Sequence, residues 1–129
     1  MASPGDRRYT KTHEWVSREG EIATIGITDF AQSELGDITY LELPEVGDAI
    51  GAQQPLGIVE SVKAANDIFS PIGGEVLARN DDAISAPETI NVSPYDRAWL
   101  VRVRMDDPGE LESLMDAAEY DAFAQAAGH

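Results

Sequence analysis

Lys63 stands in a run of small and polar residues, ESVKAAND at 60–67, that separates two apolar segments. Leu56 and Ile58 alternate before this run, and Ile68 and Phe69 follow it, as in two strands joined by a turn. The pattern predicts a β-hairpin with Lys63 at or near its tip. The chain has two lysines and seven arginines, so lysine is not its general surface cation. A modifying enzyme can acylate a primary amine on an exposed turn; a solvated surface lysine is the simpler alternative.

The sequence offers few other residues for catalysis or metal binding. It contains no cysteine, which excludes disulfides, thiolate nucleophiles and cysteine-ligated zinc. Two histidines, His13 and His129, are too few for a multi-histidine metal site, and a Ser-His-Asp triad would have to use His13. We expect His13 to be structural, beside Trp15. Because the Gly-Gly pair at 73–74 follows a proline turn and opens no helix, no phosphate-binding loop is predicted.

The composition indicates a small, strongly acidic globular domain. A chain of 129 residues fits one domain, and a domain of this size buries roughly two-thirds of its unfolded surface. The formal charge of -15 repels phosphate backbones and anionic membranes, so nucleic acid and membranes are poor candidate partners. No apolar run approaches the ~18 residues needed to span a bilayer. The acidity either steers the chain toward basic surfaces on partner proteins or keeps it soluble.

The first eight residues have neither the apolar stretch of a secretory signal nor the length and composition of a transit peptide. We expect residues 1–8 to form a flexible tail. Residues 9–129 are expected to form a single domain that includes a helical segment at 107–127. These features fit a cytoplasmic bacterial protein, and the mature form of a mitochondrial protein would look similar.

Short strands punctuated by Gly and Pro dominate the predicted secondary structure. The period of two is clearest at 99–105, where Trp99, Val101, Val103 and Met105 alternate with Leu100, Arg102 and Arg104. Further strands are expected at 22–27, 38–43, 55–62, 67–69 and 75–79. This pattern favours an antiparallel sandwich or barrel.

Three helices are expected around these strands. Asp29 and Gln32 have the spacing of a capping box, and Gly36 supplies a stop. Two more helices are expected in the C-terminal segment. One begins at the Asp-Pro pair 107–108, and the other is capped by the acidic pair 116/119, with Tyr120 and Phe123 facing inward.

The segment around Lys63 resembles the attachment sequence of lipoyl carriers, in which a hairpin lysine follows an acidic residue and precedes a small one. Biotin carriers usually place methionines beside the lysine, whereas here the neighbours are Val62 and Ala64. The resemblance extends from about residue 9 to residue 123 and is to one family, the H proteins of the glycine cleavage system. Lipoyl domains of 2-oxoacid dehydrogenases share the hairpin but lack the His-Glu-Trp and Pro-Tyr segments. The matching segments are THEW at 12–15, GITDFAQ at 26–32, LGDI at 35–38, LPEVGD at 43–48, SPIGGEV at 70–76, Asn91 and PY at 94–95.

One segment departs from the family pattern. The chain has Asp-Arg-Ala-Trp at 96–99, where the family commonly carries a glycine before the tryptophan. Ala98 lacks the backbone freedom of that glycine, which bears on the conformation of this loop more than on the function.

The resemblance implies both the fold and the role of the chain. The implied fold is mainly β, a lipoyl/biotinyl-type barrel-sandwich hybrid of short antiparallel strands with a short helix in the N-terminal half and C-terminal helices. Lipoic acid is expected on Lys63, with Glu60, Ser61, Val62 and Ala64 as the context that a lipoyl ligase or lipoyl/octanoyl transferase recognises. The chain itself is implied to be a carrier without catalytic residues.

The implied function is to shuttle the aminomethyl group of glycine. A pyridoxal-phosphate glycine decarboxylase (P protein) loads the lipoyl arm, a tetrahydrofolate-dependent aminomethyltransferase (T protein) unloads it, and dihydrolipoyl dehydrogenase (L protein) reoxidises it. Carried over from the family, Thr12, Glu14 and Asp67 are expected to line a pocket for the loaded arm, although solvated surface acids are the alternative reading of the two carboxylates.

Three other roles are considered. A lipoyl carrier of a 2-oxoacid dehydrogenase usually comes as a module of a larger acyltransferase. A relay that passes lipoyl groups to other proteins is a role of some family members. A degenerate interaction module without an arm is disfavoured by the intact segment 60–64.

Overall fold

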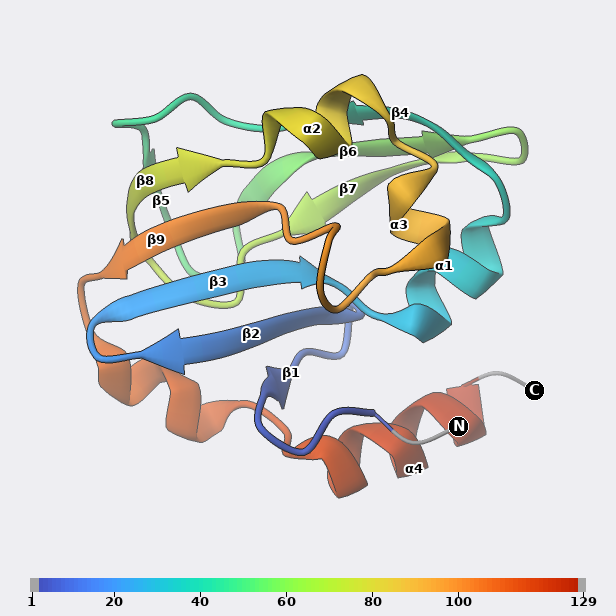
Figure 1. The fold of residues 1–129 in the computed structure, drawn as a ribbon. Coiled ribbons are helices and arrows are strands. Elements are labelled where there is room, and N and C mark those ends of the chain that lie inside the picture. The colour runs from blue at the N-terminus through green and yellow to red at the C-terminus, as the bar shows by residue number, and fades with distance from the viewer. Residues whose placement is uncertain (1–2, 128–129) are drawn as a thin grey trace.

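The computed structural model describes residues 3–127 as two antiparallel β-sheets with helices at their margins (Figure 1). One sheet has the strand order β1-β2-β3-β9-β8-β5, and the other has the order β4-β6-β7. His129, the second of the two histidines, lies outside the described residues. The strands are β1 (Arg8–Tyr9), β2 (Glu14–Glu19), β3 (Ile22–Ile27), β4 (Ile38–Glu42), β5 (Ala49–Ile50), β6 (Pro55–Ser61), β7 (Ala65–Phe69), β8 (Gly74–Arg79) and β9 (Val101–Met105). The helices are α1 (Asp29–Leu35), α2 (Asp81–Ser85), α3 (Thr89–Val92), the 3₁₀ helix η1 (Pro108–Ser113) and α4 (Ala117–Ala127).

The main core lies between the two sheets. Strand β9 buries Val101, Val103 and Met105 and exposes Arg102 and Arg104, as the period of two predicts. Facing residues of β2, β3, β4, β6 and β7 complete the same cluster, among them Val16, Ala23, Ile25, Leu41, Val59 and Ile68. The side of the six-stranded sheet that carries Arg102 therefore points away from the three-stranded sheet, and we call it the outer face.

A second cluster of buried residues covers part of this outer face. Trp15 packs there against Gly26, where an added Cβ would lie 2.5 Å from the indole ring, so the strand needs glycine at this position. The rings of Tyr9 and Tyr120 stack with centroids 4.8 Å apart, which attaches α4 to β1. Figure 1 shows η1 and α4 on the side of β1 and β2, away from the three-stranded sheet.

The mainly β architecture confirms the predicted fold class, and six predicted strands match β3, β4, β6, β7, β8 and β9 to within two residues at each end. Strands β1, β2 and β5 and helices α2 and α3 were not predicted. Strand β2 was missed because its sequence, EWVSRE, buries its first three residues in succession and so shows no alternation.

The residues predicted to start and end the helices do so in the structure, except at the start of α1. The N-cap of α1 is Thr28 and not Asp29, because the Thr28 hydroxyl accepts the Ala31 N–H at 3.1 Å. The predicted stop is the C-cap of α1, at residue 36. In α4, the reciprocal bonds of the predicted capping box form between Asp116 and Glu119. The segment after Asp107 winds as a 3₁₀ helix, which Asp107 caps.

Residues 3–8 connect to the rest of the fold through several hydrogen bonds. The Ser3 hydroxyl donates to the Asp121 carboxylate at 2.6 Å, and an Arg7 guanidinium N–H donates to the Tyr95 carbonyl at 2.6 Å. Strand β1 begins at Arg8. The flexibility of the predicted tail, residues 1–8, stays a prediction. Within residues 3–127 no helix combines the length and the apolar character needed to cross a bilayer.

Candidate functional site

The tip of the β6–β7 hairpin carries Lys63. The two strands pair up to Glu60 and Ala65, and the Ser61 N–H donates to the Ala64 carbonyl at 2.8 Å to close the turn. The Ser61 hydroxyl also accepts the N–H groups of Lys63 and Ala64 at 3.2 and 3.3 Å. These bonds fix the backbone on both sides of the lysine. Figure 1 shows this hairpin projecting at one end of the molecule.

The Lys63 side chain is exposed and lies over the C-terminal end of α1. Its Nζ is 3.5 Å from the Glu34 carbonyl oxygen, which is a long contact. An added Cβ on Gly36 would stand 3.5 Å from the Lys63 Cε, and Gly36 adopts a φ of 79°, which favours glycine. The amine is thus accessible, with only a weak contact to the protein.

A groove of about 720 Å³ runs from Lys63 to the start of β2. Its lining includes Thr12, Glu14 and Asp67, so the structure brings together the three residues that the sequence suggested for an arm pocket, although Asp67 lies more than 50 positions from the other two in the chain. Apolar side chains form much of the remaining wall, namely those of Ile27, Leu35, Val59, Ile68 and Phe69.

Glu14 is a buried carboxyl at one side of this groove, with 2% of its surface exposed. One carboxyl oxygen accepts hydrogen bonds from the Thr10 hydroxyl at 2.7 Å and from the Thr12 hydroxyl, and the other accepts the Phe69 N–H at 3.2 Å. Burial raises the pKa of Glu14, and these hydrogen bonds oppose the rise. Glu14 is therefore not the solvated surface acid of the alternative reading, whereas Asp67 is exposed.

Two further charged residues line the groove that sequence reasoning did not select. Lys11 and Glu34 join Glu14, Asp67 and Lys63 along its walls. Their positions flank the matched segments THEW and LGDI, which is the signal that would have suggested them. The groove thus has three carboxyl groups and two amines. Acylation of Lys63 would remove one positive charge and leave the groove more acidic, which favours a cationic group within it.

His13 also lines the groove, and it has structural contacts of its own. Its Nδ1 lies 2.7 Å from the Tyr120 hydroxyl, which lies 2.7 Å from the Thr28 hydroxyl. Its ring packs on Phe30 with centroids 4.6 Å apart. Burial lowers the pKa of His13, and the nearby Glu34 opposes that change. The aromatic contacts of His13 are with Phe30 of α1 and with Tyr120 and Phe123 of α4, and within residues 3–127 no ring contact joins it to the expected neighbour Trp15.

Metal ligands do not gather in this part of the protein. Throughout residues 3–127, no group of three or more His, Cys, Asp and Glu side chains is placed to hold a metal ion.

Comparison with known proteins identifies the family. The family model described as "Glycine cleavage H-protein" matches residues 7–127. The chain belongs to the glycine cleavage H-protein family. It is 50% identical over 125 residues to the glycine cleavage system H protein of Anaeromyxobacter sp. (strain K), covering 97% of this chain and 98% of that protein. It is 51% identical over 125 residues to the H protein of Bacillus subtilis (strain 168), with the same coverage of both chains.

A solved H-protein structure has the same fold. The crystal structure of the glycine cleavage system H protein from Mycobacterium marinum superposes with a TM-score of 0.86 at 34% identity, covering 98% of this chain and 100% of that one. The family and this fold make the chain a lipoyl carrier component of the glycine cleavage system. The barrel-sandwich architecture expected from the resemblance is the one that this neighbour shares.

Proposed function

We propose that Lys63 is the lipoyl attachment site and that the adjoining groove holds the loaded arm. The observation that carries the proposal is the position of an exposed amine at a hairpin tip beside a groove lined by Thr12, Glu14 and Asp67. Lys63 has one long polar contact, to the Glu34 carbonyl, so acylation of its amine breaks no ion pair of the described residues.

The residues around Lys63 fit recognition by a lipoyl ligase or a lipoyl/octanoyl transferase. Ser61 holds the turn, as its hydrogen bonds to the backbone of the next residues indicate. Val62 is 73% exposed, and an apolar side chain so exposed beside the lysine is available to an enzyme. Glu60 and Ala64 complete the context, with a carboxylate before the tip and a small residue after the lysine.

The chain attaches the lipoyl arm, presents it to the enzymes and shields the loaded arm from water. When bound, the lipoyl group supplies the disulfide that accepts the aminomethyl group of glycine and later returns as a dithiol. The apolar groove wall excludes water from the arm, and the carboxyl groups of Glu14 and Asp67 attract the cationic amine of the cargo. In this proposal the Thr12 hydroxyl, which donates to Glu14, accepts a hydrogen bond from the same amine. In this proposal the chain has no catalytic residue.

The partners follow from the carrier role. We infer that the chain binds in turn to the glycine decarboxylase (P protein), the aminomethyltransferase (T protein) and dihydrolipoyl dehydrogenase (L protein). We also infer that it acts in the bacterial cytoplasm as one domain at 9–129. A relay of lipoyl groups to other lipoate-dependent complexes is the alternative role, and a lipoyl-transfer assay separates the two.

Intact mass analysis of the lipoylated protein tests the proposal. Protein treated with a lipoyl ligase is incubated with glycine and the decarboxylase, and its mass is measured with peptide mapping around Lys63. We expect a lipoyl adduct on Lys63 that gains an aminomethyl group only when both glycine and the decarboxylase are present. The Lys63→Arg variant keeps the charge but should not be lipoylated, and wild-type modification of this variant would reject the site. An adduct that never loads would instead favour the relay.

A further inference from the structure

Three arginines and two aromatic residues gather on the outer face of the six-stranded sheet. We define the arginine patch as Arg7, Tyr95, Arg97, Trp99 and Arg102, which line one cavity of about 330 Å³. We propose that the arginine patch is a docking surface for an acidic segment of an enzyme that loads, unloads or modifies the carrier arm. The inference rests on the proposed carrier function, because that function supplies the partner.

Strand register places the patch on the exposed side of the sheet. Arg102 on β9 pairs with Thr24 on β3, and Thr24 pairs with Ser17 on β2, so these three residues share the outer face. Ser17 and Thr24 also line the cavity. They give the sheet a short polar surface beside the guanidinium groups, which suits hydrogen bonding to an approaching peptide.

Aromatic rings hold two of the guanidinium groups. The Arg102 guanidinium lies 4.2 Å from the centre of the Trp99 ring, and that of Arg7 lies 4.5 Å from the Trp15 ring and 5.5 Å from the Tyr95 ring. Stacking on a ring leaves the N–H groups at the edge of the guanidinium available to a carboxylate. Arginines held in this way lose less side-chain entropy on binding than free ones.

The exposed arginines of the patch are not neutralised within residues 3–127. The ion pairs of this region engage Arg7, Arg79 and Arg104, and none engages Arg97 or Arg102. Asp96 is the carboxylate among the described residues that line the cavity. Asp6 pairs with Arg7 at 3.1 Å, so the patch has three arginines against two aspartates and is locally positive in a chain with 24 acidic residues and 9 basic ones.

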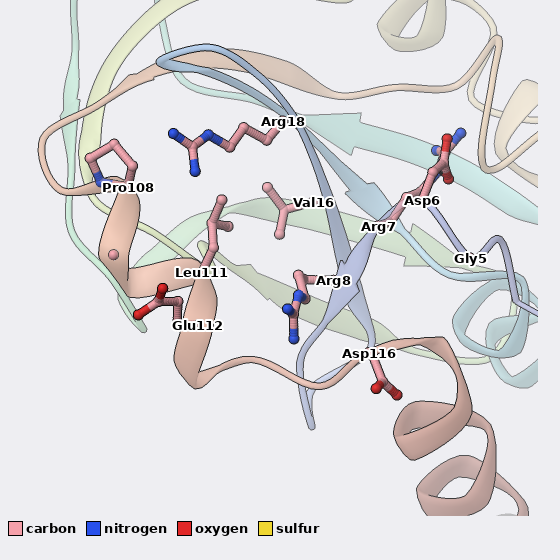
Figure 2. Close-up of a pocket in the computed structure, with 11 residues that line it drawn as sticks. Gly5, Asp6, Arg7, Arg8, Val16, Arg18, Pro108, Leu111, Glu112 and Asp116 are labelled. Atoms are coloured by element: carbon pink, nitrogen blue, oxygen red, sulfur yellow. Dashed lines mark hydrogen bonds and ion pairs between the residues drawn. The ribbon is translucent and has the colours of Figure 1, made fainter.

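A second arginine-lined cavity provides a contrast. Arg8 and Arg18 lie beside Val16 in a cavity of about 570 Å³ between β2 and η1, and Glu112 and Asp116 line the same cavity (Figure 2). Its positive and negative groups offset one another, and its arginines also donate to the backbone carbonyls of Leu114 and Gly20. Charge complementarity to an acidic partner therefore favours the arginine patch.

The residue types of the patch are those that dominate protein interfaces. Trp, Tyr and Arg are enriched at the energetic centres of such interfaces. Nucleic acid would also offer negative charge, but a net charge of -15 repels a polyanion over the rest of the surface. An acidic segment on a protein that is not acidic overall needs attraction only at the patch, so it fixes the orientation of the complex.

The patch and the arm groove share no lining residue. Glu14 and Trp15 are neighbours on β2, yet the first lines the groove and the second lines the patch cavity, because successive side chains point to opposite faces. An enzyme can therefore contact the patch without using the groove residues. Such a contact would position the carrier while the Lys63 hairpin enters the active site.

Steady-state kinetics with a matched charge control test the proposal. The Arg97→Ala, Arg102→Ala variant and the control Arg79→Ala, Arg104→Ala lose the same charge, but the control removes only arginines that already have carboxylate partners. Carrier kcat/KM is measured with the decarboxylase, the aminomethyltransferase, dihydrolipoyl dehydrogenase and the lipoyl ligase at low and high salt. We expect the patch variant to lose about tenfold in kcat/KM with at least one enzyme at low salt, and less at high salt. Equal values for the patch variant and the control with all four enzymes would overturn the inference, whereas a wild-type protein that never loads would reject the carrier function itself.

Chemical crosslinking supplies a readout besides activity. A carbodiimide joins an amine to a carboxylate in contact, so Arg102→Lys should crosslink to an acidic residue of the enzyme found by kinetics, and peptide mapping identifies that residue. The control Arg104→Lys faces Glu75 of its own chain and should not crosslink to the enzyme. Crosslinks of Arg102→Lys only to a second copy of this chain, or to no carboxylate of the enzyme, would count against the proposal.

Discussion

At the scale of single residues, the groove differs from an ordinary acidic surface because one carboxyl group is buried. Glu14 has three hydrogen-bond donors and a pKa raised mainly by burial. A cation that enters the groove stabilises the charged carboxylate, so binding of the cargo amine offsets the desolvation of Glu14. The exposed Asp67 attracts the same amine from the solvent side.

Removal of both charges should therefore loosen the loaded arm. The Glu14→Gln, Asp67→Asn variant keeps the side-chain sizes, so we expect normal lipoylation but release of ammonia from the loaded protein about five- to thirtyfold faster, equivalent to about 1–2 kcal/mol of lost attraction. Ammonia is followed with a coupled enzyme assay after removal of the decarboxylase. The exposed pair Glu19→Gln, Asp82→Asn removes the same charge away from the groove and serves as the control. Identical release rates from the two variants would show that the groove does not hold the cargo.

At the scale of elements, the sequence predicted those parts whose signals are local. The hairpin of Lys63, the start of η1 and the capping box of α4 were found because turn and cap residues act within four positions. Strand β2 could not be predicted in the same way because it buries its first three residues in succession, and the burial of Glu14 depends on Phe69, which lies 55 positions later in the chain. The Thr10 hydroxyl that supports Glu14 was also missed, because Thr10 shows its role only once the backbone bends back at His13, whose φ is 72°.

The β2–β3 pair depends on one such non-local contact. A Cβ at position 26 would overlap the Trp15 indole at 2.5 Å, and this ring is 1% exposed and bonded to the Pro94 carbonyl, so it has no room to move. We expect Gly26→Ala to lower the free energy of unfolding by about 1–3 kcal/mol. Urea denaturation followed by tryptophan fluorescence measures the loss. Gly5→Ala is the control, because nothing lies within 4 Å of its added Cβ, and an equal effect of the two substitutions would contradict this account of the packing.

At the scale of the whole molecule, α4 packs on the outer face of the six-stranded sheet and contacts His13, which lines the groove. Tyr9 and Met115 exchange backbone hydrogen bonds of 2.8 and 3.0 Å, which join β1 to the segment before α4. From α4, the Tyr120 hydroxyl contacts both His13 and Thr28 at 2.7 Å. The C-terminal helix thus supports the segment that carries Thr12 and Glu14. A substitution in α4 should therefore change how the groove holds the loaded arm.

The Tyr120→Phe substitution tests this coupling. It leaves the stacked ring in place but removes the hydroxyl, so the buried side chain of Thr28 and the Nδ1 of His13 both lose a hydrogen-bond partner. We expect the free energy of unfolding to fall by about 1–3 kcal/mol, because unpaired buried polar groups are costly. Lipoylation of Lys63 should be unchanged, since the hairpin turn is held by Ser61 and not by α4. Ammonia release from the loaded protein should be faster than in Tyr40→Phe, whose ring is 46% exposed and serves as the control. If the variant is less stable but releases ammonia at the wild-type rate, α4 contributes to stability only. The lost hydrogen bonds would then not affect the position of Glu14.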